Sequence, residues 1–243
     1  MKKIPPINEL RKVCIKKKEH PMYARLFSRK IALYFTWFLL HFNVTPNQAT
    51  FISLFFSIIG SSFFILGQYK YSIMAAILLQ LSYIFDCVDG EIARFTKLGN
   101  PKGHYFDRIA EYISSSLIFV GITFGAYRMF NEAYYFIFGF AAVLSILYFR
   151  MFSSEKYKIL YEYSLKLKEN PKASINKKKV LELLKLLHDK IGFFFRIPAL
   201  TNIITIAAFF NALNSALIFY GTIFPFIAFG NFIYETKMRF NIK

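Results

Sequence analysis

The sequence predicts an all-α integral membrane protein, with six transmembrane helices preceded by an N-terminal amphipathic helix at the membrane interface. Three observations predict this fold class. Hydrophobic residues make up 56% of the 243 residues and aromatic residues 20%, which is more apolar side chain than a soluble domain of this size usually carries. The apolar residues occur in long blocks, as expected for segments that cross lipid. The charged residues gather between these blocks.

The first thirty residues are basic, with ten Lys and Arg and only two acids. They contain no short apolar core near Met1 of the kind that marks a cleavable signal, so we expect insertion to rely on internal segments. An apolar stretch at residues 31–42 follows Arg29 and Lys30 and contains Trp37. At about 1.5 Å per residue it is too short to cross a hydrocarbon core of about 30 Å. We expect it to lie at the interface, with an ordinary buried helix as the alternative.

The first span has a recognisable start, because Thr45 can cap a helix whose first position is Pro46. The second span follows a break at Gly67. The last two spans are short, and they divide near Asn211 to Asn214. The apolar blocks predict spans at about residues 48–67, 72–95, 104–127 and 133–152, and two more that share residues 197–235.

The charge distribution predicts the topology. The net charge of +17 fits either nucleic acid or anionic lipid, but its position between apolar blocks favours lipid and excludes a nucleic-acid partner. With six spans, both termini and the lysine-rich segment lie on one side, and loops rich in Lys and Arg stay cytoplasmic. The expected divisions are a basic N-terminal region at 1–44, a transmembrane domain at 45–235 with a basic loop at 155–190, and a cytoplasmic tail at 236–243.

Acidic residues occur where a membrane segment should have none. Asp86, Asp89 and Glu91 lie near the end of the second span, and Asp107 and Glu111 lie near the start of the third. Ionisable groups at membrane depth are costly and usually mark a function. At about 100° per residue, two sets of residues each fall on one helix face: Asp86, Asp89, Gly90 and Ala93 on the first helix, and Gly103, Asp107 and Glu111 on the second.

A short turn between these two helices would bring four carboxylates around one cavity. Unpaired carboxylates at such distances repel each other, and divalent cations remove this conflict. All-oxygen ligands suit Mg²⁺ or Mn²⁺. Gly90, Ala93 and Gly103 remove side-chain bulk where a ligand could approach, and Arg94 offers a fork of donors suited to phosphate. These residues together predict a phosphoryl-transfer site.

The motif reads Asp86-x2-Asp89-Gly90-x2-Ala93-Arg94-x8-Gly103-x3-Asp107-x3-Glu111. It resembles the signature of the CDP-alcohol phosphotransferase family, integral membrane enzymes of phospholipid synthesis. The spacing agrees throughout, and seven of the eight positions carry the family's residue. The six-helix layout, the preceding amphipathic helix and the opening Thr45-Pro46-Asn47-Gln48-x-Thr50 also resemble that family. The departure is the last acid, which is Glu111 here and Asp in the family.

The resemblance implies a metal-dependent transfer of a substituted phosphate group from a CDP-alcohol, such as CDP-diacylglycerol, to an acceptor alcohol, with release of CMP. It implies two Mg²⁺ or Mn²⁺ ions, a cytoplasmic active site in the cell membrane, and a homodimer by analogy. The donor lipid and the acceptor alcohol stay open. By this resemblance the metal ligands are Asp86, Asp89, Asp107 and Glu111, the catalytic residues are Glu111 as base with Asp107 and Arg94, and the nucleotide pocket is shaped by Gly90, Ala93, Arg94, Gly103, Asn47 and Thr50.

Other readings of these residues remain. A divalent-cation transporter or a catalytically silent membrane protein could use the same carboxylates, although their position at one end favours the enzyme. Arg150 and Arg196 would lie at the cytoplasmic boundary, either as topology anchors or as ligands for an anionic acceptor such as a phosphorylated polyol. His104 is expected to be a solvated or capping group, and Cys87 is expected to fill space.

Overall fold

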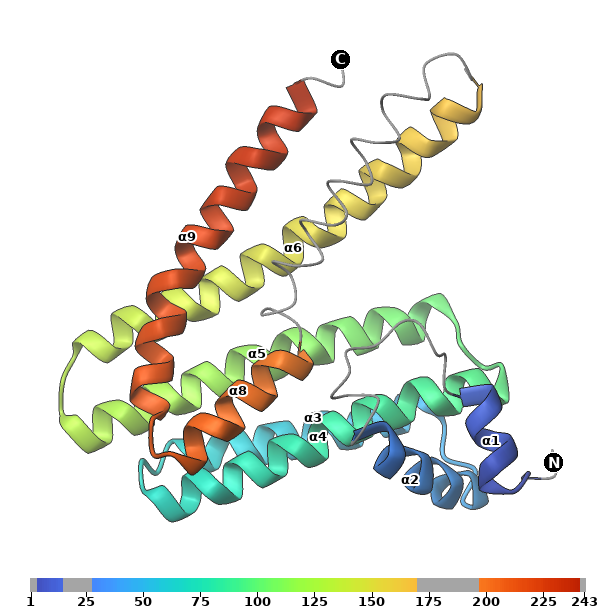
Figure 1. Ribbon diagram of the computed structural model, residues 1–243, viewed down its shortest axis with the longest axis horizontal. Coiled ribbons are helices and arrows are strands. Elements are labelled where there is room, and N and C mark those ends of the chain that lie inside the picture. Colours follow the sequence, from blue (N-terminus) through green and yellow to red (C-terminus); the bar gives the residue numbers. More distant parts are fainter. Residues whose placement is uncertain (1–3, 15–27, 170–196, 241–243) are drawn as a thin grey trace.

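The protein folds entirely into helices over the residues that the computed structural model describes, which are 4–14, 28–169 and 197–240. This confirms the all-α prediction (Figure 1). In chain order the helices are α1 (Ile7–Cys14), α2 (Arg29–His41), α3 (Pro46–Phe64), α4 (Tyr69–Thr96), α5 (Pro101–Phe130), α6 (Tyr134–Glu169), α8 (Ile197–Phe209) and α9 (Leu213–Phe240).

Five helices are long and apolar enough to cross a membrane, and they make this an integral membrane protein. They are α3, α4, α5, the first half of α6 (Tyr134–Met151) and most of α9 (Leu213–Gly230). Of the two spans predicted within 197–235, the first, which is the predicted fifth span, corresponds to α8, whose described part has 13 residues. At about 1.5 Å per residue this part covers only about 20 Å, so the described residues provide five candidate spans and do not show a sixth. Asn211, at φ 54°, breaks the chain before α9, which confirms the predicted division.

Helix α3 begins as the sequence predicts. The Thr45 side chain accepts a bond from the backbone N–H of Gln48, and the Gln48 side chain accepts the backbone N–H of Thr45 at 2.8 Å. Together with Pro46 at the first helical position, this reciprocal pair fixes where the helix starts. The start matters because it places Asn47 and Thr50 in the first turns of α3.

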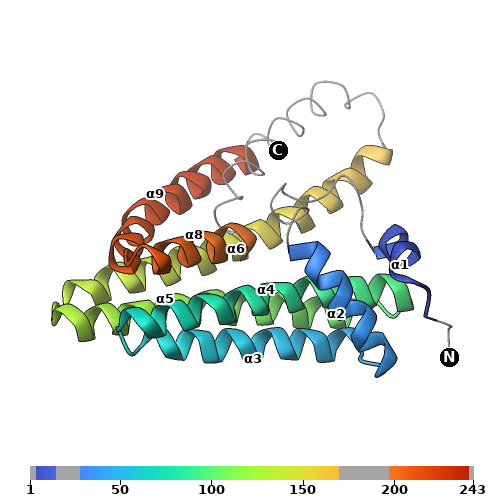
Figure 2. The same cartoon turned by 60° about the horizontal axis from the view of Figure 1, so that its bottom comes forward.

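Helices α3, α4 and α5 form a layer in which α3 packs on both other helices, antiparallel to α4 and parallel to α5 (Figure 2). Two glycines of α5, one turn apart, allow α3 and α5 to approach closely. A Cβ atom added at Gly121 would collide with the backbone carbonyl of Ser61, and one added at Gly125 would collide with that of Phe64. This is the close packing that small residues four apart permit between membrane helices.

Helices α6, α8 and α9 pack on one face of this layer. Helix α8 packs on α4, where Gln80 Nε2 donates to Thr205 Oγ1 at 2.8 Å and to Asn202 Oδ1 at 3.1 Å. Helices α6 and α9 run side by side and project beyond the layer (Figure 1). The main core lies between the two sets, around Phe119, Tyr220 and Leu200.

The predicted basic segment at 155–190 begins within α6, which continues without interruption to Glu169. Its cytoplasmic position stays a prediction. Charged residues do not by themselves end a helix, and the first proline after this stretch is Pro171. Residues 170–190 lie outside the described part of the chain, and so does Arg196.

The N-terminal region is more structured than the sequence suggested. Helix α2 is the predicted apolar segment and begins at Arg29. Helix α1 was not predicted, although Ile7, Leu10 and Cys14 have helical spacing, and Leu10 and Cys14 are fully buried. Both helices pack on the carboxyl half of α4. They lie at the end of the layer where α4 turns into α5 (Figures 1 and 2).

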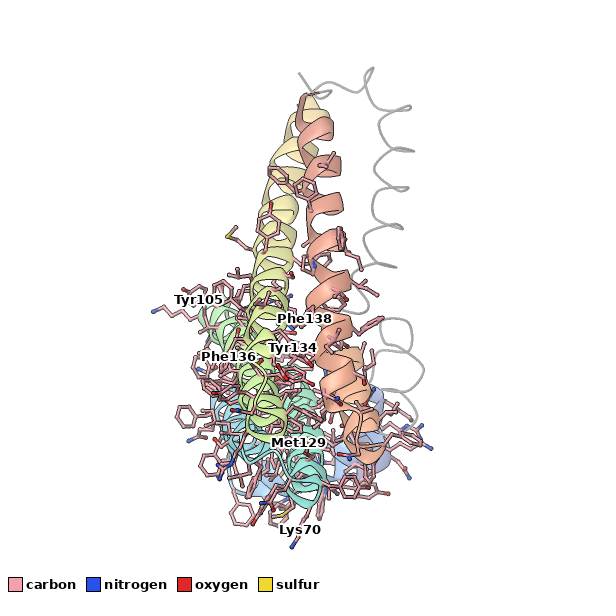
Figure 3. The ribbon with its side chains drawn as sticks, turned by 90° about the vertical axis from the view of Figure 1, so that its left-hand side faces the viewer. Lys70, Tyr105, Met129, Tyr134, Phe136 and Phe138 are labelled. Carbon is pink, nitrogen blue, oxygen red and sulfur yellow. The ribbon has the colours of Figure 1, made fainter. Side chains whose placement is uncertain are left out.

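The opposite end of the layer carries few charges. Lys70 begins α4 there, and Arg128 and Glu132 lie at the turn between α5 and α6. Figure 3 views the molecule from this end, where Lys70 points away from the body and Tyr134 and Phe136 lie near the start of α6. The acidic motif lies at the other end of the layer, where α4 turns into α5 and where α1 and α2 also lie.

Candidate active site

Three aspartates from two helices converge at the end of the layer. Asp86 and Asp89 come from α4 and Asp107 comes from α5, and one carboxylate oxygen of each lies within 4.8 Å of the others. Residues 97–100 connect the two helices, and the Asn100 side chain caps α5 by accepting the backbone N–H of Gly103 at 2.7 Å. The short turn and this cap set the register of α5, so the two predicted helix faces do meet.

The three aspartates form a site that fits a divalent cation. Asp89 is buried, and Asp86 and Asp107 are half-buried. Within the described ranges, no Lys or Arg forms an ion pair with any of the three. Carboxylates held this closely repel each other unless a proton or a cation lies between them. Because their ligand atoms are all oxygens, the cluster could hold a metal ion of the Mg²⁺ or Mn²⁺ type.

Thr50 and Asn47 reach this region from the start of α3. Thr50 Oγ1 donates to Asp89 Oδ2 at 2.7 Å, so this hydroxyl orients one of the aspartates. Asn47 lies against the start of α5, where its Oδ1 is 3.0 Å from the position that a Cβ of Gly103 would take. Sequence reasoning had placed both side chains beside the nucleotide. In the structure one contacts a carboxylate, and the other packs where Gly103 leaves space.

Glu111 lies beside the cluster rather than in it. Its Oε2 is 3.3 Å from Arg108 Nη1 and 3.4 Å from Arg150 Nη1. Glu111 and Asp86 nevertheless line the same small cavity. The expectation that four carboxylates meet is thus realised for three, among the residues described, while the fourth is held by two arginines. The sequence could not reveal this, because Arg150 comes from α6.

Seven of the twelve residues that line the cavity between Asp86 and Glu111 carry a hydroxyl group. It extends from the acids into the bundle, between α3, α4, α5 and α8. The Ser53 hydroxyl donates to the backbone carbonyl of Ser82 at 2.8 Å, so part of this lining is fixed by bonds between α3 and α4. The hydroxyl groups come from Thr50, Ser53, Ser57, Ser82, Tyr83, Ser114 and Thr201.

Arg94 folds back along α4 over Gly90. Its Nη1 lies 3.2 Å from the position that a Cβ of Gly90 would take, so a side chain at residue 90 would crowd the guanidinium. Its Nε donates to the backbone carbonyl of Cys14 at 2.9 Å. Ala93 is half-buried on the same helix face as the aspartates. Arg94 therefore lies at the junction between the acidic face of α4 and the end of α1.

Three further residues are placed as follows. His104 is exposed, as expected for a solvated group. Cys87 is buried among apolar residues, as expected for a side chain that fills space. Glu91 is the residue whose role sequence reasoning missed: it is fully buried and accepts a bond from Thr36 Oγ1 of α2 at 2.8 Å. Glu91 follows Asp86 by five residues, which corresponds to a rotation of about 140° around the helix axis. This spacing already indicated that the two side chains lie on different faces of α4.

Comparison with known proteins agrees with this geometry. Residues 43–227 match the family described as CDP-alcohol phosphatidyltransferase. Over 83 residues the chain is 31% identical to archaetidylinositol phosphate synthase of Pyrococcus horikoshii, a match that covers 34% of this chain and 43% of that protein. The matched segment is thus less than half the length of that relative. Enzymes of this family synthesise phospholipids and depend on metal ions. The family match covers α3 to α8, the aspartate cluster and most of α9, so the chain belongs to the CDP-alcohol phosphatidyltransferase family.

Proposed function

We propose that this enzyme transfers a substituted phosphate group from a CDP-alcohol, such as CDP-diacylglycerol, to a small acceptor alcohol and releases CMP. One observation carries the proposal. The ligand oxygens of Asp86, Asp89 and Asp107 lie within 4.8 Å of one another, in the register of the family motif and without a cationic side chain paired to them among the described residues.

Different residues have different roles in this reaction. Asp86, Asp89 and Asp107 would hold the metal ions, and Thr50 keeps the Asp89 carboxylate in place. When bound, the ions supply positive charge to the donor pyrophosphate and align the attacking and leaving oxygens. Arg94 places further positive charge beside the phosphate that leaves with CMP.

Glu111 is the proposed general base. The acceptor hydroxyl gives its proton to a Glu111 carboxylate oxygen and attacks the β-phosphorus of the donor. The bond between that phosphorus and the oxygen shared with the α-phosphate breaks, and CMP leaves with that oxygen. Glu111 reaches one methylene further than the family's Asp, and its contacts with Arg108 and Arg150 hold the carboxylate at the wall of the cavity.

Arg150 is the described residue best suited to an anionic acceptor. It is buried, with 8% of its surface exposed, and it lies beside Glu111. A topology anchor would instead keep its charge in water or among lipid headgroups. The name of the Pyrococcus relative refers to a product that still carries a phosphate on inositol. Inositol phosphate is therefore the first acceptor to test, ahead of glycerol phosphate, inositol and serine.

The remaining proposals concern the membrane. The transmembrane domain at 45–235 carries the site, and α8 belongs to a sixth crossing. The end with α1, α2 and the aspartates faces the cytoplasm, since the opposite end has only Lys70, Arg128 and Glu132 and basic segments stay inside. The protein forms a homodimer. Reporter fusions after residues 68 and 98 would test the orientation, because the two turns must report opposite sides.

The central test is an assay of CMP release by the purified protein. It uses CDP-diacylglycerol and its ether-lipid analogue as donors, Mg²⁺ or Mn²⁺, and the panel of acceptor alcohols. We expect CMP to appear only when a divalent cation and a matching acceptor are both present, and to stop when EDTA is added. Absence of CMP with every pairing, from protein that is folded by its melting temperature, would refute the proposed reaction.

A further inference from the structure

The cavity beside Asp86 and Glu111 continues into the bundle as a narrow polar space. Hydroxyl groups reach this space from four helices. They belong to Ser53 and Ser57 of α3, Ser82 and Tyr83 of α4, Ser114 of α5 and Thr201 of α8, with Thr50 of α3 near the acids. Serines are common between membrane helices because they are small and can form hydrogen bonds between helices, so each one needs its own explanation.

Ser53 is explained by a bond between helices. Its hydroxyl donates to the backbone carbonyl of Ser82 at 2.8 Å, and its Oγ lies 3.3 Å from Ser82 Oγ. Bonds of this kind attach one membrane helix to another without any ligand. Ser53 and Ser82 therefore fix α3 against α4.

Ser57 lies one turn further along α3 and has no such bond. It is fully buried, its side chain lines the cavity, and its Oγ has no hydrogen-bond partner among the described residues. It does not bond to its own helix either, in contrast to Ser62, which donates to the carbonyl of Ile58 at 2.9 Å. A buried hydroxyl without a partner costs free energy, so this group needs a partner from the cavity.

The size of the cavity limits what this partner can be. The centre of a water molecule can move within about 10 Å³ of it. This is close to the minimum of about 10–15 Å³ that one buried water needs. An acceptor alcohol such as glycerol phosphate or inositol phosphate is many times larger, so the space behind the acids is not its binding site. A buried water makes about three hydrogen bonds, and the hydroxyl groups of α3, α4 and α5 can supply them.

Ser61, one turn beyond Ser57, provides a comparison within the same helix. It is 4% exposed, and its Oγ also lacks a hydrogen-bond partner among the described residues. Ser61 is not among the residues that line the cavity. At this level α3 and α5 approach so closely that a Cβ atom at Gly121 would collide with the carbonyl of Ser61. The small size of Ser61 suits this contact, whereas Ser57 faces open space.

We propose that the cavity binds one ordered water molecule, which Ser57 holds in the space behind Asp86 and Glu111. The water forms the hydrogen bond that the Ser57 hydroxyl does not form with the described protein groups, and hydroxyl groups of α4 and α5 complete its contacts. The polar region of the active site thereby extends into the bundle. This proposal does not depend on the reaction that the active site performs, because it rests on the cavity and on Ser57.

Thermal unfolding of two variants of the full-length protein tests the proposal. Ser57→Ala removes the hydroxyl, and Ser61→Ala is the matched control. Because the Ser57 change removes a hydrogen bond and leaves the water short of a partner, the melting temperature should fall by about 2–4 °C. The Ser61 change removes a buried hydroxyl that has no partner, so the melting temperature should stay the same or rise.

The difference between the two variants decides the outcome. Equal shifts of either sign would show that the cavity gives Ser57 no partner, and they would overturn the proposal. A rise in the melting temperature for Ser57→Ala would have the same meaning.

An experimental structure of the wild-type protein, at a resolution that shows ordered water, provides a second test. We expect one density peak in the cavity at about 2.7–2.8 Å from Ser57 Oγ. In Ser57→Val the peak should disappear, because the side chain fills the space and offers no hydrogen bond. A cavity without density in the wild type would overturn the proposal. A peak at about 2.0–2.1 Å from its oxygen neighbours would do so too, because that distance indicates a cation such as Mg²⁺.

Discussion

The carboxyl half of α4 carries buried carboxylates on two sides, and their surroundings differ. On the side facing α5, Asp86 and Asp89 meet Asp107 within 4.8 Å, without an ion pair to any described Lys or Arg. On the side facing α1 and α2, Glu91 is a single acid whose carboxylate accepts a hydrogen bond from Thr36 at 2.8 Å.

The difference distinguishes a cation-binding site from a buried acid that has a role within the protein. Like charges that gather without counter-charges cost free energy, and a folded protein tolerates the arrangement where a ligand supplies the missing charge. A single acid that accepts a hydrogen bond has no neighbouring carboxylate with which to share a cation. The aspartate side of α4 therefore predicts cation binding, whereas the Glu91 side predicts a role within the protein. Four experiments test this contrast.

The largest effect is expected for Asp89→Asn. The amide keeps the shape and removes the charge that would bind the cation, so CMP release should fall by about 10³-fold, comparable to the loss of a main electrostatic contact in an active site. The assay measures CMP release from purified protein or membranes. The control is Glu132→Gln, the same change at the exposed turn of the opposite end, which should leave the rate unchanged. Near-wild-type activity of Asp89→Asn would remove the metal role.

A large effect is also expected for Glu111→Gln. Loss of the general base should lower kcat by about 10²-fold, whereas Glu111→Asp, which restores the acid typical of the family, should stay within about tenfold of wild type. The measurement is kcat at saturating donor and acceptor. If the Gln variant matches wild type, water or another group accepts the proton, and Glu111 only pairs with Arg108 and Arg150.

A moderate effect is expected for Thr50→Val. This change removes the hydroxyl that donates to Asp89 Oδ2 at 2.7 Å. Groups that orient metal ligands typically contribute about 10–100-fold to metal affinity, so the Mn²⁺ concentration for half-maximal activity should rise about tenfold while kcat at saturating Mn²⁺ changes little. Thr50→Ser keeps the hydroxyl and should behave like wild type. A fall in kcat without a shift in the Mn²⁺ dependence would place Thr50 with the nucleotide instead.

The smallest effect concerns the thiol that attaches α1 on the Glu91 side. Burial raises the pKa of the Cys14 thiol to about 11. The thiol then stays protonated at pH 8, and because the thiolate is the reactive form, alkylation should be slow. In a Cys87→Ala protein, maleimide should label Cys14 slowly until the pH approaches that value, and rapidly after denaturation. Rapid labelling of the folded protein at pH 8 would show that α1 is not packed on α4.

Several features could be read from the sequence because their cause is local. Thr45 and Pro46 start α3 as predicted, and Asn211 separates α8 from α9, because capping and left-handed backbone depend on neighbouring residues. Helical periodicity put Asp86 and Asp89 on one face, and the short turn after α4 returned the chain so that Asp107 could meet them. The register of the motif thus predicted the aspartate cluster.

Other features depend on segments far apart in the chain. Glu111 is held by Arg150 of α6, and Glu91 is held by Thr36 of α2. Spacing along α4 and α5 shows which way these acids point, but not which helix lies there. The helices and their acidic faces follow from the amino-acid pattern alone, since helix geometry repeats every few residues. The packing of the helices determines which acids pair with a side chain of another helix, as Glu111 does with Arg150 and Glu91 with Thr36, and which gather where a cation could bind, because these partners are far apart along the chain.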